Sequence, residues 1–91
     1  MGPFKPDPAG SGNLIPNPWS WNAQANMLYV EQPAGVGYSY SNTTSDYTVG
    51  DARAAADVWS FLQGWYSMPE FSKYLSNDLH ISGESYGGHV S

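Results

Sequence analysis

Short apolar runs and one long amphipathic stretch alternate along this chain, and each predicts a different element. Residues 27–31 form an apolar run of the length of a buried strand, and residues 79–82 form a second one. Between them, residues 51–66 carry apolar side chains at helical spacing. This spacing predicts a helix whose apolar stripe packs against a sheet (Ala55, Val58, Trp59, Leu62, Trp65 and Tyr66). The order strand, helix, strand indicates a parallel α/β arrangement.

Turn and cap residues set the predicted limits of these elements. Most of the seven prolines lie within residues 1–18, which predicts a loop with no helix and no central strand. Thr48 and Asp51 have the spacing of a capping box, so the helix is expected to begin there. Pro69 follows its predicted end, and residues 70–75 are expected to add one further helical turn.

Composition and charge narrow the functional classes. With 91 residues the chain makes one small domain at most, and its 41% hydrophobic and 12% charged residues indicate a folded segment. A net charge of −5 with three Lys and Arg argues against nucleic acid as a partner. The absence of cysteine excludes disulfides and thiolate metal sites within this stretch, and the acidic residues show no metal-ligand spacing. No apolar run approaches the ~20 residues that span a bilayer, and any targeting signal is expected outside this chain.

The candidate chemistry lies at Gly83-x-Ser85-x-Gly87, which fits a nucleophile elbow between a strand and a helix. Such a turn holds the serine hydroxyl above the sheet, and both glycines are expected to be required because the turn is crowded. Backbone N–H groups at the start of the following helix can stabilise an oxyanion. The pattern predicts strained φ and ψ angles at Ser85 and a helix beginning near Tyr86. On these residues alone, an ordinary glycine turn is the alternative.

Two histidines lie near this serine without the geometry of a catalytic base. His89 follows Ser85 by four residues and would lie one turn up the same helix, whereas the base must approach from a separate loop. His80 lies in the predicted strand and is expected to pack or to hydrogen-bond there. Gly35 and Gly37 do not make a dinucleotide loop, because the third glycine of that motif is absent.

Four blocks of the chain resemble the serine carboxypeptidases. Residues 84–89, Glu-Ser-Tyr-Gly-Gly-His, resemble the family's Gly-Glu-Ser-Tyr-Ala/Gly-Gly-His signature. Residues 17–22 resemble its Asn-Pro-x-Ser-Trp-Asn, and residues 29–40 and the opening residues 2–4 agree in order and spacing. The resemblance covers nearly the whole chain. It implies an α/β class and an incomplete α/β-hydrolase fold over residues 1–91, a fragment that ends at the nucleophile turn.

The resemblance also implies roles for single residues. Ser85 matches the acylated nucleophile, and Tyr86 matches the residue whose backbone N–H forms half of the oxyanion hole. Gly83 and Gly87 match the glycines of the elbow. Glu84 matches a carboxylate that helps to recognise the free C-terminal carboxylate of a peptide. In the family a second Glu pairs with it, and two close carboxyls require one of them to hold a proton, which fits cleavage in acid.

The implied reaction is hydrolysis of a C-terminal peptide bond through an acyl-enzyme, with no metal and no cofactor. The glycine-rich segment that supplies the second oxyanion N–H would lie just before Met1, and the triad Asp and His would lie far downstream of Ser85. The isolated chain is therefore expected to be inactive. Carboxypeptidase-like acyltransferases and hydroxynitrile lyases resemble the peptidases in these motifs, and a non-catalytic truncated fragment is a further alternative.

The same resemblance implies a sheet arrangement. The strand of the glycine-rich segment would lie between residues 27–31 and 79–82, which places these two strands about two spacings, roughly 9–10 Å, apart. Direct parallel pairing through a right-handed crossover is the alternative.

The resemblance to this family implies a secreted or vacuolar/lysosomal protein. It also implies action on peptide or protein C-termini, with no nucleic-acid or membrane partner. Asn42-Thr43-Thr44 matches the N-glycosylation sequon in a stretch that is expected to be an exposed loop. The sequence leaves the oligomeric state open.

Overall fold

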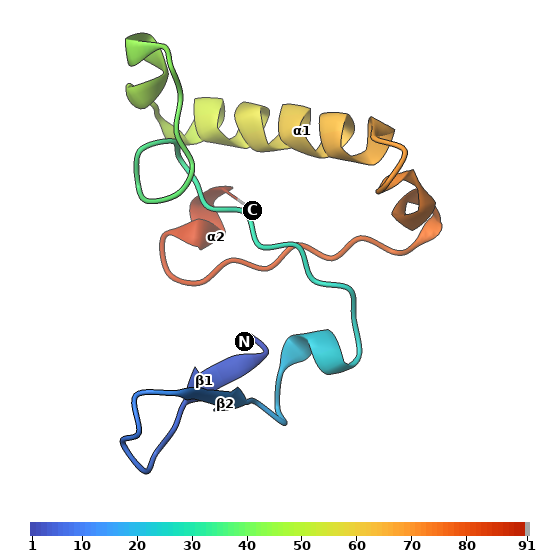
Figure 1. Ribbon diagram of the computed structural model, residues 1–91. Helices are drawn as coiled ribbons and strands as arrows, with labels where there is room; N and C mark the ends of the chain where they lie inside the picture. The colour runs from blue at the N-terminus through green and yellow to red at the C-terminus, as the bar shows by residue number, and fades with distance from the viewer. Residues whose placement is uncertain (91) are drawn as a thin grey trace. The chain divides into compact units, whose positions relative to one another are not determined.

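In the computed structural model, which describes residues 1–90, the proline-rich N-terminal segment forms a short hairpin (Figure 1). Strand β1, Phe4–Pro6, pairs antiparallel with β2, Leu14–Pro16, and Lys5 lies opposite Ile15. The expectation of a loop throughout this segment was therefore wrong. The hairpin belongs to the first of two units, Met1–Val30, and the second unit begins at Glu31.

The register explains how prolines fit into these two strands. Backbone hydrogen bonds from Asp7 to Asn13 (N···O 3.0 Å) and from Asn17 to Pro3 (N···O 2.8 Å) flank the ladder. Because hydrogen-bonded and non-hydrogen-bonded pairs alternate in an antiparallel ribbon, Pro6 and Pro16 both fall at non-hydrogen-bonded positions. The missing N–H of each proline therefore removes no ladder hydrogen bond.

A turn after the hairpin holds the first residues of the chain. The Asn17 side-chain amide donates to the Gly2 carbonyl at 2.9 Å, and the Ser20 hydroxyl donates to the Met1 carbonyl at 3.2 Å. The backbone N–H of Trp21 donates to the same Met1 carbonyl at 3.1 Å. Ser20, which also hydrogen-bonds to Asn22, is one of the few buried residues. This turn leads into a short 3₁₀ helix, η1 (Trp21–Ala23), and fixes the backbone at Met1 and Gly2.

The second unit is organised around helix α1, Asp51–Ser67, which confirms the predicted helix. Its N-cap is Gly50, and no side chain caps the helix, so the predicted capping box at Thr48 was wrong. Thr48 instead ends the preceding 3₁₀ helix, η2 (Thr44–Tyr47). After Pro69 the expected extra turn is present as η3, Ser72–Ser76, and the chain then reaches the short helix α2, Gly87–Val90.

Aromatic stacking holds η3 against the end of α1. The Trp65 ring lies 4.5 Å from the Phe71 ring with an interplanar angle of 14°, and 6.0 Å from the Tyr74 ring. Offset stacking of this kind contributes about 0.5–1.5 kcal/mol per pair beyond the area that it buries. The return of the chain after Pro69 is therefore set by side chains near the C-terminal end of α1.

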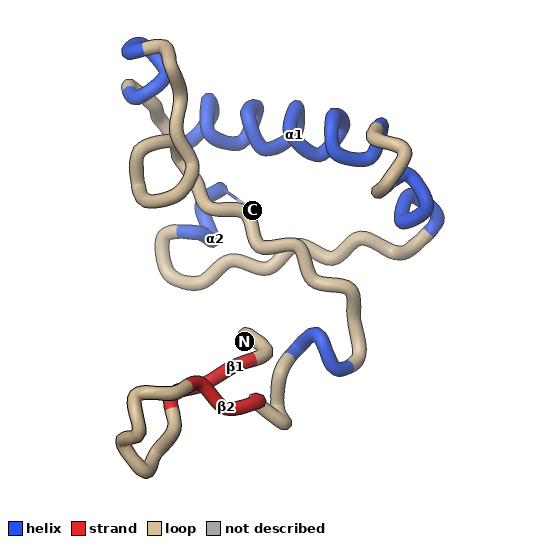
Figure 2. The backbone as a smooth tube through the Cα atoms, in the orientation of Figure 1, coloured by secondary structure: helices blue, strands red, loops and turns tan. Residues whose placement is uncertain are grey.

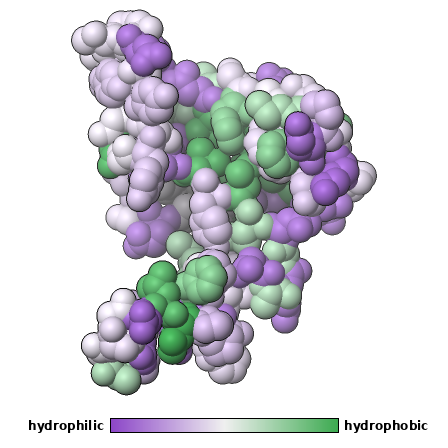
Figure 3. Space-filling view, in the orientation of Figure 1, coloured by the Kyte–Doolittle hydropathy of each residue, from purple (hydrophilic) through white to green (hydrophobic). Residues whose placement is uncertain are grey.

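The rest of the helix does not pack as the sequence predicted. Among the side chains that the structure describes, residues 1–89, Ala54 is the only buried apolar one, while Ala55 is exposed and Trp59 is 62% exposed. Apolar surface is also open to view in Figure 3. The stripe is therefore only partly covered, because Val58, Leu62, Trp65 and Tyr66 are half-buried and none of the six is fully buried.

Residues 27–31 and 79–82 are not hydrogen-bonded strands, which corrects the sequence prediction. Both run as loop in Figure 2, and the only sheet in residues 1–90 is the hairpin β1–β2. Leu28 is 41% exposed and Ile81 is 59% exposed. A strand is defined by its ladder, and neither segment has a neighbouring strand in residues 1–90 to complete one. The expected spacing between the two therefore stays a prediction.

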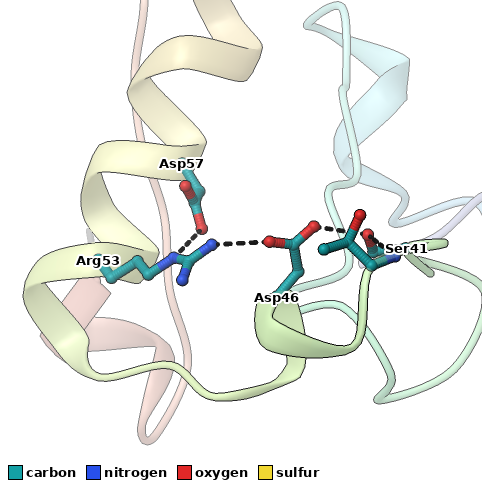
Figure 4. A network of polar contacts seen from close by, with 5 residues as sticks. Ser41, Asp46, Arg53 and Asp57 are labelled. Atoms are coloured by element: carbon teal, nitrogen blue, oxygen red, sulfur yellow. Dashed lines mark hydrogen bonds and ion pairs between the residues drawn. The ribbon is translucent and has the colours of Figure 1, made fainter.

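A polar network joins η2 to the first turns of α1 (Figure 4). The Asp46 carboxylate accepts from the Ser41 hydroxyl at 2.6 Å and from Arg53 Nη2 at 2.9 Å, while Arg53 Nε lies 3.7 Å from Asp57. The Ser41 hydrogen bond, followed by the Arg53 hydrogen bond, lowers the pKa of Asp46 below its ordinary value of 3.8. The network therefore stabilises the fold above that pH and is lost as the pH falls through the lowered pKa. The Asp46, Arg53 and Asp57 side chains are 38%, 47% and 61% exposed, so the contribution is small.

No helix within residues 1–90 is long and apolar enough to cross a bilayer.

We expect the isolated 91-residue chain to unfold without a cooperative transition, because so little apolar surface is buried. Helical circular dichroism should fall gradually on heating, and urea should act with an m-value below about 1 kcal/mol/M. The complete reading frame, measured alongside, should give a sigmoidal curve. A sharp transition of the isolated chain, with slow amide exchange throughout α1, would show that these residues are self-sufficient.

Candidate active site around Ser85

The backbone of Ser85 adopts a left-handed conformation. Its φ angle is +55°, and it is the only residue other than glycine with positive φ in residues 1–90. It lies in a turn that leads directly into α2, so the predicted strain and the predicted helix start are confirmed. A left-handed residue with a Cβ costs about 1–2 kcal/mol, so the surrounding turn has to hold it.

Gly83 makes this turn possible. A Cβ built at position 83 would lie 2.6 Å from the carbonyl carbon and 2.6 Å from the carbonyl oxygen of Gly87. Real Cβ atoms do not approach backbone that closely, so any other residue would push the two sides of the turn apart. A Cβ at Gly87 would meet nothing within 4 Å. The structure thus gives a steric reason for glycine at position 83 and none at position 87.

Hydrogen bonds within the turn leave the backbone N–H groups of Glu84, Ser85 and Tyr86 without an acceptor in residues 1–90. Gly87 N–H donates to the Glu84 carbonyl at 3.0 Å, and Gly88 N–H donates to the Ser85 carbonyl at 3.1 Å. The C=O and the N–H of a trans peptide point in opposite directions. Because the Ser85 carbonyl points at Gly88, the N–H of Tyr86 in the same peptide faces away from this turn. It donates no hydrogen bond within residues 1–90. This N–H is therefore available to an oxygen atom outside the turn.

The side chain of Tyr86 connects the turn to α1. Its hydroxyl donates to Asp51 Oδ1 at 2.7 Å, and its ring lies 4.9 Å from the His89 ring. The hydrogen bond to Asp51, together with the charge of that carboxylate, raises the pKa of the Tyr86 hydroxyl above 10.0. The sequence pattern assigned Asp51 to a capping box. No local spacing could reveal this contact, because the two residues are 35 positions apart.

The other residues singled out in the sequence lie in the open. Glu84 is exposed, and its side chain makes no hydrogen bond or ion pair within residues 1–90. His89 lies beside the Tyr86 ring and makes no hydrogen bond to Ser85, and His80 is exposed rather than packed. Asn42 is exposed just before η2. Residues 1–90 contain no group of three or more His, Asp or Glu side chains that could hold a metal ion.

Comparison with known proteins finds matches to one family. The family described as serine carboxypeptidase matches residues 1–91. Serine carboxypeptidase-like 26 of Arabidopsis thaliana is 52% identical over 90 residues, which are 98% of this chain and 19% of that protein. Serine carboxypeptidase-like 41 of the same plant is 49% identical over 98% of this chain and 18% of its own length. No solved structure gives a significant match.

The chain belongs to the serine carboxypeptidase family, as its motifs predicted. This family implies the α/β-hydrolase fold. The chain itself contains helices and two short strands. The chain spans about a fifth of the length of the curated relatives that it matches.

The two glycines of the turn should respond differently to alanine. In the complete reading frame, Gly83→Ala should lower the free energy of unfolding by about 1–3 kcal/mol, because its Cβ overlaps backbone. Gly87→Ala should change it by less than about 0.5 kcal/mol, since its Cβ meets open space. Urea denaturation of both variants measures the difference. Equal losses would mean that the close approach of residues 83 and 87 does not occur in solution.

Proposed function

We propose that the protein containing this chain is a serine-type carboxypeptidase that removes C-terminal residues from peptides through an acyl-enzyme on Ser85. Membership of the family supports the proposal, and the observation that carries it is the left-handed Ser85 beside the free N–H of Tyr86. A nucleophile held in this way is exposed, and a donor stands next to it for the charge that develops during acyl transfer.

The proposed reaction begins at the Ser85 hydroxyl. Its oxygen bonds to the carbonyl carbon of the last peptide bond while its proton passes to a general base, and the carbonyl oxygen takes the negative charge. The Tyr86 N–H stabilises that oxyanion. The C–N bond then breaks, the base returns the proton to the leaving amine, and water hydrolyses the ester to free the serine. Family resemblance assigns the base to a histidine outside residues 1–91.

Glu84 is proposed to recognise the free carboxylate of the substrate, together with a second carboxyl outside the chain. Its exposure beside Ser85 supports this role, because an exposed side chain is accessible to a peptide terminus. Two carboxyls and a carboxylate can share one site only when protons are held between them. The substrate class is therefore a peptide or protein C-terminus, bound in acid, without metal or cofactor.

Ser85 should be essential for turnover by the complete reading frame. That protein should release the C-terminal residue of a blocked dipeptide in acid, and Ser85→Ala should abolish the release. The control is Ser82→Ala, which changes a serine three positions earlier and should leave turnover unchanged. Equal turnover by wild type and Ser85→Ala would dismiss Ser85 as the nucleophile.

The isolated 91 residues should not react with a fluorophosphonate probe, in contrast to the complete protein. No histidine in residues 1–90 hydrogen-bonds to Ser85, and loss of one oxyanion donor alone costs on the order of 10²–10³ in rate. Robust labelling of the isolated chain would show that it carries its own base. It would also argue against a non-catalytic fragment.

We further propose that Asn42 carries an N-linked glycan in a secreted or vacuolar protein. The exposed side chain of Asn42 makes no hydrogen bond within residues 1–90, which supports access by a transferase. On expression through a secretory pathway, Asn42→Gln and Thr44→Ala should each remove one glycan, seen as a faster gel band insensitive to glycosidase. Thr44→Ser preserves the sequon and should keep the slower band. An unshifted wild-type band would contradict the proposal.

A further inference from the structure

The hydrogen bond between Asp51 and Tyr86 joins the first residue of the long helix to the residue that follows Ser85. We propose that Asp51 is a positioning residue, which holds Tyr86 so that its backbone N–H points at the oxyanion formed during acylation of Ser85. The inference rests on the proposed function, and it concerns a residue that the local sequence pattern assigns to a capping box.

Three contacts of Tyr86 carry the argument. Its hydroxyl donates to Asp51 Oδ1 at 2.7 Å, its ring lies 4.9 Å from His89, and its carbonyl accepts from His89 N–H at 3.0 Å. The peptide between Ser85 and Tyr86 is held by Gly88 N–H, which reaches the Ser85 carbonyl at 3.1 Å. Tyr86 is thus fixed at both its backbone and the tip of its side chain.

The turn needs such an anchor. Residues 83–86 have no ladder to hold them within residues 1–90, and the left-handed Ser85 costs about 1–2 kcal/mol to maintain. Tyr86 is 65% exposed, so packing alone does not fix its side chain. A hydrogen bond to a charged acceptor is stronger than one between neutral groups, and Asp51 supplies that acceptor from a 17-residue helix.

The position of Asp51 at the start of a helix is also relevant. Asp51 is the first residue of α1, where the unpaired N–H groups of the helix end favour a negative charge. Its carboxylate caps no backbone N–H of the helix and is used by Tyr86 instead. Asp51, which the sequence pattern placed in a capping box, therefore contacts the candidate active site instead.

The test is a double-mutant cycle in the complete reading frame. Asp51→Ala and Tyr86→Phe should each lower kcat by about tenfold, less than the 10²–10³ lost with an entire donor, because the N–H is displaced rather than removed. The double variant should be no slower than either single one, since both remove the same contact. Asp51→Asn keeps an acceptor oxygen and should recover most of the rate.

Two further measurements separate positioning from other roles. Affinity for a peptide aldehyde, whose adduct carries the oxyanion, should weaken in parallel with kcat, while KM for the dipeptide stays unchanged. Asp57→Ala, also on α1, and Tyr66→Phe, which removes a hydroxyl with no partner within residues 1–90, are the matched controls and should match wild type. Thermal unfolding of every variant identifies any that do not fold. If Asp51→Ala does not fold, the comparison of Tyr86→Phe with Asp51→Asn still tests the contact.

Several outcomes would overturn the inference. Wild-type kcat in Asp51→Ala and Tyr86→Phe, with Ser85→Ala inactive, would refute positioning and leave the proposed function intact. A raised KM in Tyr86→Phe with unchanged aldehyde affinity would make the hydroxyl a substrate contact instead. Additive losses in the double variant would show that the two residues act separately. Turnover by Ser85→Ala, in contrast, would refute the proposed function itself.

Discussion

A close approach of two backbone segments governs the candidate site. The carbonyl of Gly87 lies only 2.6 Å from the place that a Cβ of residue 83 would occupy, so position 83 accepts only glycine. This approach lets the chain reverse within the turn, which places Ser85 in the left-handed region and aims the Tyr86 N–H away from the helix that follows. A larger residue would open the turn, and the serine and its neighbouring donor would then no longer share one short loop. The chemistry proposed for Ser85 thus depends on the absence of a side chain two residues earlier.

Helix α1 contacts this turn and the segment that precedes it. Helix α1 offers Asp51 at its start to the Tyr86 hydroxyl, and Trp65 near its end stacks on the aromatic rings that follow. Both ends of one helix are therefore connected to the segment that leads to Ser85. The hydrogen bond from Arg53 to Asp46 also holds the segment before α1 against the first turns of that helix. The first unit is organised separately, by the hydrogen bonds of Asn17, Ser20 and Trp21 to the first two residues.

Local patterns predicted the elements that depend on nearby residues. Helical spacing and Pro69 located α1 within a residue of its observed end, and the spacing of Gly83 and Ser85 predicted the strained turn. The same reasoning failed where the outcome depends on a partner strand. Residues 27–31 and 79–82 have the apolar character of strands, yet neither becomes one without a neighbour to complete its ladder. The hairpin was missed because its prolines argue against strands. Prolines are tolerated at positions where the ladder makes no hydrogen bond.

The sequence by itself determined the family, the long helix and the serine turn, because each depends on residue types at short spacing, where steric and hydrogen-bonding rules act directly. The tertiary structure alone decided that Asp51 meets Tyr86 rather than capping its own helix, since the two lie 35 residues apart. It also decided that Gly83 is sterically required while Gly87 is not. Both results are set by which atoms approach in space, and a linear pattern of residues does not contain that information.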